Sequence, residues 1–325
     1  MHNHKAVVHW CETTLKSKGY CLLGTVEAVR LMLWSKVYRI LTSEGYIYIK
    51  QMTTPFAIEA KLIHYLAGRE QPALPTLIAY NEALLCFMML DSGTTLRTIL
   101  KQYYDIDIVT QGLVTYANIQ QEMSQSLEAL LALGVPDWRL QCLPRHYHAL
   151  LSHEAWLLND GLTAPELDDL KNTHSQFVEI CEQLASYKIP ETIEHCDFQD
   201  NNLLLQQEFV TINDWADAVI AHPFFSLHSF LQSARRNHGF AENSTIDNAL
   251  KNAYLQAWIG FESDQRLLEI YDLTKILHPI KFAMSFYRIT LCVETEADNV
   301  ELSEYKGTIT QALRVFIDEM QTLKR

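Results

Sequence analysis

Basic residues are scarce in this sequence. The 325-residue chain has 26 lysine and arginine residues against 39 aspartate and glutamate residues, which gives a net charge of −13. Nucleic acids and anionic membranes bind basic surfaces, because lysine and arginine neutralise their phosphates. We therefore expect neither as a partner. The acidic balance is compatible with a cationic small molecule, although a solvated acidic surface gives the same total.

Long hydrophobic segments and paired cysteine motifs are also absent. No apolar run approaches the ~18–20 residues that span a bilayer, and residues 1–5 do not lead into the apolar segment of a signal peptide. The seven cysteines are scattered and never form Cys-x-x-Cys, so the pattern indicates neither a disulfide framework nor a zinc site. These features are typical of a cytoplasmic protein with reduced thiols.

The most informative stretch is residues 193–205, Ile-Glu-His-Cys-Asp-Phe-Gln-Asp-Asn-Asn-Leu-Leu-Leu. It places His195, Asp197 and Asn202 in the pattern His-x-Asp-x-x-x-x-Asn, and Asp214 follows Asp197 by seventeen residues. Phosphoryl transfer from a nucleotide needs these residue types. One carboxylate accepts the proton of the acceptor hydroxyl, while an amide oxygen and a second carboxylate hold the metal ion.

The spacing of these residues brings their side chains together. Residues 203–205 and 210–212 are short apolar runs separated by a polar turn, which predicts two strands of a hairpin. A hairpin of that length places Asn202 and Asp214 at the same end, and Asp197 lies on the loop that leads into it. Three fixed positions can match by chance, but a further acid after a hairpin-compatible gap is much rarer.

The two motifs resemble those of the aminoglycoside phosphotransferase and choline kinase-like superfamily. Its members have a protein-kinase-like fold, a His-Gly-Asp-x-x-x-x-Asn loop and a later Ile-Asp-Trp metal motif, which is Asn-Asp-Trp at residues 213–215 here. The resemblance implies that Asp197 is the catalytic base and that Asn202 and Asp214 are Mg²⁺ ligands. It also implies that His195 braces the catalytic loop.

Two departures from the family pattern bear on activity, and a third feature departs from protein kinases alone. Cys196 replaces the glycine of the first motif, so we expect a backbone conformation there that does not require glycine. Ser226 replaces an aspartate often found in the family, which leaves open how the catalytic loop is braced. Residues 28–36 contain no glycine, so the Gly-x-Gly-x-x-Gly loop of protein kinases is absent, as it often is in small-molecule kinases.

Upstream of these motifs, the sequence predicts a β-hairpin. Residues 37–41 and 46–50 alternate in polarity around Thr-Ser-Glu-Gly. Alternation places Lys50 on the face opposite Ile47 and Ile49. Lys50 ends its strand as the phosphate-binding lysine of kinase-like folds does, whereas in isolation it would be a solvated charge at a sheet edge.

A helix is predicted to follow this hairpin. Thr54 precedes a proline, a start signal in which the threonine is the N-cap and the proline lies in the first turn. Glu59 then shares a helix face with Leu62 and Leu66. Because an acid on an inward face needs a partner, we expect an ion pair between Glu59 and Lys50.

Two further segments complete the predicted nucleotide site. Ser35 lies where related families often place a small polar residue near the phosphates, although an ordinary turn residue fits as well. The apolar run at 83–90 predicts a buried strand that Asp-Ser-Gly then ends. In the superfamily that the chain resembles, this point is the hinge between lobes, where backbone groups of Met88, Met89 and Leu90 would bind adenine.

The remainder of the chain is predicted to be mostly helical. Apolar spacing indicates helices at 229–234, 246–258, 265–277 and 304–323. The last of these carries an apolar stripe made of Ile309, Leu313, Phe316, Met320 and Leu323. Helices of this lobe wall the acceptor pocket in the kinases that the chain resembles. Asp217 either faces the acceptor or caps the segment that follows it.

These patterns predict an α+β, two-lobe, protein-kinase-like fold. Residues 1–90 would form an N-terminal nucleotide-binding lobe with an antiparallel sheet, and residues 91–325 a mostly helical catalytic lobe. We expect a Mg²⁺-dependent phosphotransferase that uses ATP or GTP and a hydroxyl of a small molecule, such as a cationic amino alcohol or an aminoglycoside. Two alternatives are a nucleotide-binding pseudokinase or regulatory protein without turnover, and a helical interaction protein with an accidental motif. The oligomeric state is not indicated.

Overall fold

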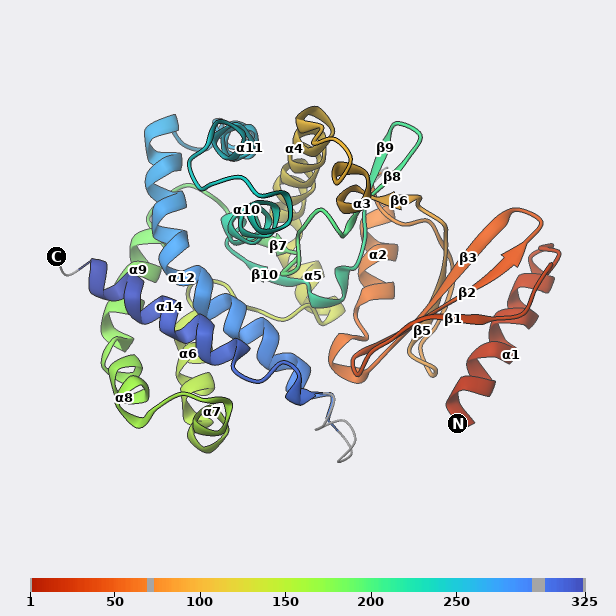
Figure 1. Cartoon of the computed structure of the whole chain (residues 1–325), viewed down its shortest axis with the longest axis horizontal. Coiled ribbons are helices and arrows are strands. Elements are labelled where there is room, and N and C mark those ends of the chain that lie inside the picture. The colour runs from red at the N-terminus through yellow and green to blue at the C-terminus, as the bar shows by residue number, and fades with distance from the viewer. Residues whose placement is uncertain (1, 69–72, 294–301, 324–325) are drawn as a thin grey trace.

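A five-stranded antiparallel sheet lies at one end of the molecule, and helices make up most of the rest (Figure 1). The computed structural model describes residues 2–68, 73–293 and 302–323. The predicted α+β class with a small sheet-containing part and a mostly helical part is confirmed. The last strand of the sheet in the sequence ends at Leu90, the residue that ends the N-terminal lobe in our prediction.

The sheet has the strand order β1-β2-β3-β5-β4. Its strands are β1 (Glu27–Leu31), β2 (Ser35–Thr42), β3 (Gly45–Met52), β4 (Leu77–Asn81) and β5 (Cys86–Leu90). The predicted hairpin is formed by β2 and β3, in which Thr42 pairs with Gly45 at the turn. Gly45 has a φ of +100°, a left-handed conformation that a side chain would strain.

Each face of the sheet is covered by a helix (Figure 1). Helix α1 (His2–Ser17) buries its apolar residues in one small core together with Ile47, Ile49 and Met88. Helix α2 (Glu59–Ala67) joins the main core, to which Phe87 also belongs. Because side chains alternate along a strand, Lys50 points to the opposite face from its neighbour Ile49, and this is the face on which α2 lies.

The start of α2 differs in detail from the prediction. A 3₁₀ turn, η1 (Thr54–Phe56), comes first, and its N-cap is Thr53 rather than Thr54. Thr54 is already inside the helical turn, so it cannot act as the cap. The hydroxyl of Thr53 makes no capping bond either, because it donates to the carbonyl of Trp34. Helix α2 itself begins at Glu59.

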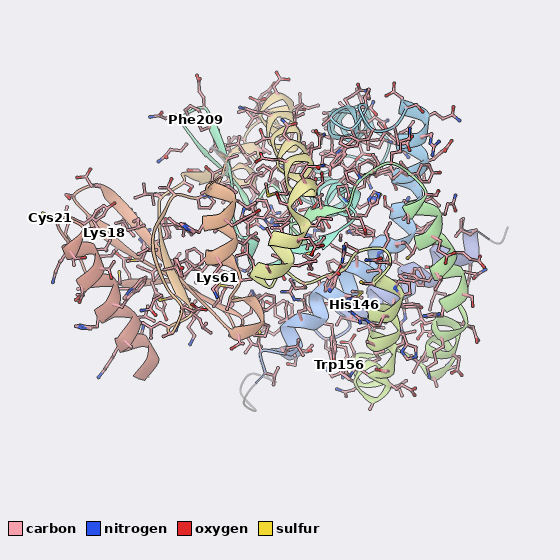
Figure 2. The ribbon with its side chains drawn as sticks, turned by 180° about the vertical axis from the view of Figure 1, so that it is seen from behind. Lys18, Cys21, Lys61, His146, Trp156 and Phe209 are labelled. Atoms are coloured by element: carbon pink, nitrogen blue, oxygen red, sulfur yellow. The ribbon has the colours of Figure 1, made fainter. Side chains whose placement is uncertain are left out.

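The connection between the two parts of the chain depends on a glycine. Gly93 has a φ of +98°, and a Cβ atom there would lie 2.2 Å from the carbonyl oxygen of Leu205. The close approach lets β6 (Thr94–Thr95) pair with β8 (Leu203–Gln206), which in turn pairs with β9 (Phe209–Ile212). Figure 2 shows Phe209 on the hairpin of β8 and β9, which extends from the body of the protein. Helix α3 (Leu96–Leu100) follows β6.

The remaining elements form the helical part. Its helices are α4 (Ile106–Met123), α5 (Leu127–Leu133), α6 (Leu143–Ser152), α7 (Glu154–Asp160), α8 (Ala164–Asn172), α9 (His174–Ala185), α10 (Phe224–His238), α11 (Thr245–Gln256), α12 (Asp264–Thr290) and α14 (Thr308–Thr322). Short 3₁₀ turns, η2 (Ser124–Ser126) and η3 (Trp215–Asp217), and two strands, β7 (Thr192–Glu194) and β10 (Val219–Ala221), complete it.

The four helices predicted near the C-terminus are present as α10, α11, α12 and α14. Most of the predicted stripe on α14 is buried against the core, but Leu323 was wrongly included. It is 55% exposed, because α14 ends at Thr322 and the stripe ends with it. Across the described ranges, no helix combines the length and the apolar character that crossing a membrane requires.

Candidate active site

The catalytic loop connects β7 to β8 and fixes both oxygens of Asp197. Oδ1 accepts a hydrogen bond of 2.6 Å from Gln199, and Oδ2 accepts one of 2.8 Å from the amide nitrogen of Asn202. Burial and the nearby charge of Asp214 raise the pKa of Asp197 above the ordinary value of 3.8. The carboxylate is therefore both oriented and more basic than a free aspartate, which suits a proton acceptor.

The metal motif lies directly beside this loop. The amide of Asn213 donates to the carbonyl of Asn202 over 2.8 Å, so the hairpin brings the two motifs together as the spacing predicted. His195 adds a second link, with its Nε2 atom 2.9 Å from the carbonyl oxygen of Asn213. Burial lowers the pKa of His195, so its neutral ring donates this bond and braces one loop against the other.

Lys50 reaches from the sheet to the same point. Its Nζ atom lies 2.7 Å from Glu59 and 2.6 Å from Asp214. The predicted ion pair between Lys50 and Glu59 is confirmed. Glu59 also accepts a 3.0 Å hydrogen bond from the amide of Trp215, so one carboxylate holds both the lysine and the metal loop.

The charges of this cluster follow from burial and pairing. Burial favours neutral Lys50, but Asp214 and Glu59 outweigh it and raise the pKa of Lys50. Burial raises the pKa of Glu59 to about 7 despite Lys50. Burial also acts to raise the pKa of Asp214, but Lys50 outweighs it and the pKa is lowered. Asp214, with 39% of its side chain exposed, is thus an anionic oxygen donor open to a ligand.

A second buried ion pair, which the sequence did not reveal, lies beneath the catalytic loop. Lys281 from α12 places its Nζ atom 2.7 Å from Glu194, and neither side chain is exposed. The lysine also donates to the carbonyl of Cys196 over 3.1 Å, and the amide of Cys196 is 3.3 Å from Glu194. Cys196 has a φ of +65°. Glycine is not required there, as we expected, but the conformation is one that glycine favours.

Glu194 of this pair also braces the catalytic loop in the absence of an aspartate at position 226. The hydroxyl of Ser226 donates a short hydrogen bond to Glu194 and lies 2.7 Å from the phenol oxygen of Tyr116. That phenol oxygen accepts a 2.9 Å hydrogen bond from the amide of His195. The bracing carboxylate is therefore supplied by β7 rather than by α10. The available signal was a glutamate one residue before His195 of the first motif.

The other residues predicted for the nucleotide site lie in strands β2 and β5. Ser35 begins β2 opposite Met52, two residues from the position where β2 faces Lys50. Met88 and Met89 lie in β5, which is paired on both sides by β3 and β4. The amide of Leu90 donates to the carbonyl of Thr76. The backbone of β5 is therefore largely engaged within the sheet up to Leu90.

Asp217 ends the turn η3, close to the metal motif. Burial raises the pKa of Asp217 to about 7, although Arg288 opposes the shift. Arg288 donates to the carbonyl of Asp217 over 2.8 Å and to the carbonyl of Pro55 over 3.1 Å. It thereby joins α12 to both the metal loop and the turn before α2. This arginine was also missed, because an arginine near a helix end resembles a surface charge.

A cavity of about 800 Å³ opens beside Asp197. Its lining residues come largely from helices α10, α12 and α14, the helices at the C-terminal end of the chain. Asp217 is not among the described residues that line it.

The fold and the site together define a kinase-like phosphotransferase. The model of the phosphotransferase enzyme family (APH) matches residues 51–266. The chain belongs to this family and is an enzyme of the phosphotransferase class. The match includes Glu59, the catalytic loop and the metal motif, and it begins one residue after Lys50. No curated protein matches the chain by sequence.

Solved structures with the same fold include three kinases or kinase complexes. The choline kinase of Cryptosporidium parvum Iowa II has a TM-score of 0.61 at 12% identity, with 97% of each chain covered. The GDP and kanamycin complex of APH(2")-IIia has a TM-score of 0.60 at 14% identity, covering 97% of this chain and 99% of the other. Amicoumacin kinase hAmiN, in complex with AMP-PNP, Ca²⁺ and Ami, has a TM-score of 0.57 at 10% identity, covering 98% and 96%. At these identities the likeness shows the fold.

Proposed function

We propose that this enzyme transfers the γ-phosphoryl group of ATP or GTP to a hydroxyl of a small molecule. The observation that carries the proposal is the 2.6 Å contact between Lys50 and Asp214, which joins the sheet to the metal motif beside Asp197. A cation and an anionic oxygen donor in one place are what a metal-bound triphosphate requires. The structural neighbours solved with AMP-PNP and with GDP support a nucleotide as the donor.

The donor set of the site fits Mg²⁺. Asp214 offers a carboxylate whose lowered pKa keeps it ionised. The amide nitrogen of Asn202 is engaged by Asp197, so its amide oxygen is the atom that can bind a metal. Mg²⁺ prefers such hard oxygen ligands, usually one or two from the protein together with phosphate oxygens. When bound there, the ion would neutralise charge on the phosphates.

Lys50 and Glu59 would prepare the site for the phosphates. Glu59 holds Lys50 at 2.7 Å and keeps it cationic in a buried position. Lys50 would then bind phosphate oxygens. Ser35, at the start of β2, would lie near the same phosphates. The backbone groups of β5 up to Leu90 are largely bonded in the sheet, so adenine would meet the chain at the end of this strand, where it leaves the sheet.

Asp197 would act on the acceptor. Its carboxylate would take the hydroxyl proton as the oxygen bonds to phosphorus and the bond to the leaving phosphate breaks. Gln199 and Asn202 hold the two carboxylate oxygens, so the base loses little freedom when the acceptor binds. His195 would fix this loop to the metal motif. Asp217, which does not line the cavity beside Asp197, would act on charge near the metal rather than on the acceptor.

The alternatives raised by the sequence are weaker than this function. Membership in the phosphotransferase enzyme family argues against a helical interaction protein with an accidental motif. The pseudokinase was motivated by Cys196, Ser226 and the glycine-poor loop at residues 28–36. The pair of Glu194 and Lys281 braces the catalytic loop at the first two positions, and glycine-poor loops also occur in small-molecule kinases. The seven free cysteines fit a reducing compartment such as the cytoplasm.

Calorimetric titration with ATP and with GTP, each with and without Mg²⁺, tests the nucleotide site. We expect Mg²⁺-dependent binding that Asp214→Ala weakens at least tenfold, while Asp272→Ala, an exposed acid on α12, leaves it unchanged. Mass spectrometry of an acceptor panel would then detect the added phosphoryl group. Absence of nucleotide binding to the wild-type protein under every condition would overturn the proposal.

A further inference from the structure

The cavity beside Asp197 is large and partly apolar. Its volume of about 800 Å³ is in the range of pockets for drug-sized ligands, roughly 300–1,000 Å³. A simple amino alcohol would leave most of it to water. One wall is apolar and consists of Pro279, Phe282, Ala312 and Val315. Such a cavity suits an acceptor that carries a sizeable apolar part beside its hydroxyl.

Basic side chains outnumber carboxylates by one in the lining of this cavity. Four cations line it, namely Arg235, Arg236, Lys275 and Lys306. Apart from Asp197, the lining carboxylates are Glu242 and Glu319. Glu242 is held by Lys275 at 3.1 Å and by Arg235 at 3.5 Å, so its charge is already neutralised. Within the described chain, Arg236 and Lys306 have no ion-pair partner.

The two histidines in the wall do not change this balance. Burial lowers the pKa of His228 to about 3 and holds that of His278 well below its ordinary value, so both rings are neutral. A multiply charged cation needs carboxylates to bind it. Apart from Asp197, Glu319 is the one lining carboxylate that has no ion pair within the described chain. An anionic group would find Arg236 and Lys306 unpaired.

On the basis of the proposed function, we infer that the acceptor is a drug-sized hydroxyl compound with an apolar part and an anionic group. This differs from what the overall charge of −13 suggested. Net charge describes the whole surface, whereas the lining of the cavity sets the local potential that an acceptor meets. A small cationic amino alcohol and a polycationic aminoglycoside fit this lining poorly.

A calorimetric titration of the protein loaded with Mg²⁺ and AMP-PNP tests the inference. The probes are 4-nitrophenyl β-D-glucuronide and 4-nitrophenyl β-D-glucoside, which differ by one carboxylate, together with choline and kanamycin. We expect the glucuronide to bind at least tenfold more tightly than the other three. Equal or tighter binding of the glucoside, choline or kanamycin, or no binding of the glucuronide, would overturn the inference.

A matched pair of variants locates the binding. Arg236→Gln should weaken the glucuronide about tenfold, because it removes a charge-assisted hydrogen bond. Arg145→Gln, an exposed arginine outside the cavity, should not. An equal effect of both variants would contradict the assignment. Binding of Mg²⁺ and AMP-PNP is measured first on the same samples. If it is absent, the proposed function is contradicted rather than the inference about the acceptor.

An independent observation concerns the backbone of Cys196. Both of its hydrogen-bonding groups are engaged by one buried ion pair, the amide by Glu194 and the carbonyl by Lys281. The residue has a φ of +65°, which a side chain makes unfavourable, and Asp197 follows it directly. We propose that Glu194 and Lys281 are positioning residues, which hold Asp197 in place by fixing the strained conformation of Cys196.

A rescue experiment separates this role from general stability. Lys281→Met should lower kcat for the hydrolysis of Mg²⁺-bound ATP by water at least tenfold, with little change in KM. Adding Cys196→Gly should restore most of kcat, because glycine adopts a positive φ without being held. Should Lys281→Met fold poorly, the same rescue is measured after Glu194→Gln is added, which removes both charges. Failure of glycine to restore kcat, or a parallel change in KM, would overturn the proposal.

Discussion

Two buried lysine–glutamate pairs flank the proposed reacting centre, and they differ in what the lysine does with its remaining hydrogen-bonding capacity. Lys50 lies 2.7 Å from Glu59, and Lys281 lies 2.7 Å from Glu194. Lys50 also contacts Asp214, whose side chain is 39% exposed. Lys281 instead contacts the backbone of Cys196 and is wholly enclosed. The same ion pair thus presents charge to a ligand in one case and holds the backbone in the other.

The difference has an energetic consequence. A lysine with two carboxylate partners keeps one if the other is removed or is drawn away by a metal. A lysine with a single carboxylate partner in an enclosed site is left unpaired when that partner is removed. An unpaired buried charge is strongly destabilising. The pair around Lys50 is therefore suited to exchange partners during binding. The pair around Lys281 is suited to remain unchanged through the reaction.

The largest effect is expected at Asp197, which lies between the two lysine–glutamate pairs. Asp197→Asn keeps the shape of the side chain but removes the proton acceptor, so kcat should fall about 10²–10⁴-fold. Binding of Mg²⁺ and ATP should change little, since neither lysine pair is altered. Single-turnover transfer and calorimetry on the same variant measure the two quantities. Activity that survives this substitution would remove Asp197 from the role of base.

The two glutamates should differ in their effect on stability. Glu194→Gln leaves Lys281 without a carboxylate and should lower the free energy of unfolding by about 3–5 kcal/mol. Glu59→Gln leaves Lys50 paired with Asp214, so we expect a smaller loss of about 1–2 kcal/mol. Denaturant unfolding of the three proteins provides the comparison. Equal losses would show that the pairs do not differ as their surroundings suggest.

The pH dependence of turnover reports on the charges that meet at Asp197. Burial and Asp214 raise its pKa above 3.8, so the base is protonated and inactive until the pH exceeds this higher value. The acid limb of kcat for ATP hydrolysis should therefore lie above the usual range of an aspartate. A profile that stays flat down to the ordinary pKa would contradict the environment described for Asp197.

The smallest expected effect concerns Asp217, which lies three residues after Asp214. Burial raises its pKa to about 7, so the neutral form stabilises the fold. This contribution is complete below the unfolded pKa near 3.8 and is lost as the pH rises through about 7. Between pH 5.5 and 8.5 the wild-type Tm should fall a few degrees more than that of Asp217→Asn, a difference kept small by partial exposure. Identical shifts would show that Asp217 does not titrate there.

The pair of Lys50 and Glu59 could be predicted from the sequence, and the pair of Lys281 and Glu194 could not. Alternation along a strand and helical spacing place Lys50 and Glu59 on facing surfaces only nine residues apart, and the motif around Asp197 supplies a reason for the pair. Lys281 lies 85 residues beyond Cys196 on a long helix, where a lysine resembles a surface charge. Its burial results from how α12 packs under the loop, and local patterns do not determine such contacts.

Backbone details were also beyond the sequence. The positive φ of Cys196 and of Asp214 occurs in loops held by distant partners, and residue type gave no signal for it at Cys196. The 3₁₀ turn before α2 begins at Thr54, so its N-cap is Thr53, whose hydroxyl bonds to Trp34 instead of capping the turn. The local charge of the cavity beside Asp197 likewise depends on three helices that are separated in the sequence.

The most direct test compares Mg²⁺-dependent ATP affinity in Lys50→Met and Lys281→Met. Lys50 is proposed to bind phosphates, so its loss should weaken ATP roughly 10–100-fold, the value of a charge-assisted hydrogen bond. Lys281 is enclosed behind the catalytic loop, so ATP affinity should stay within about threefold of wild type in its variant, provided calorimetry is done below the Tm. Equal losses, or a larger loss for Lys281→Met, would contradict the assignment of the pair of Lys50 and Glu59 as the nucleotide site.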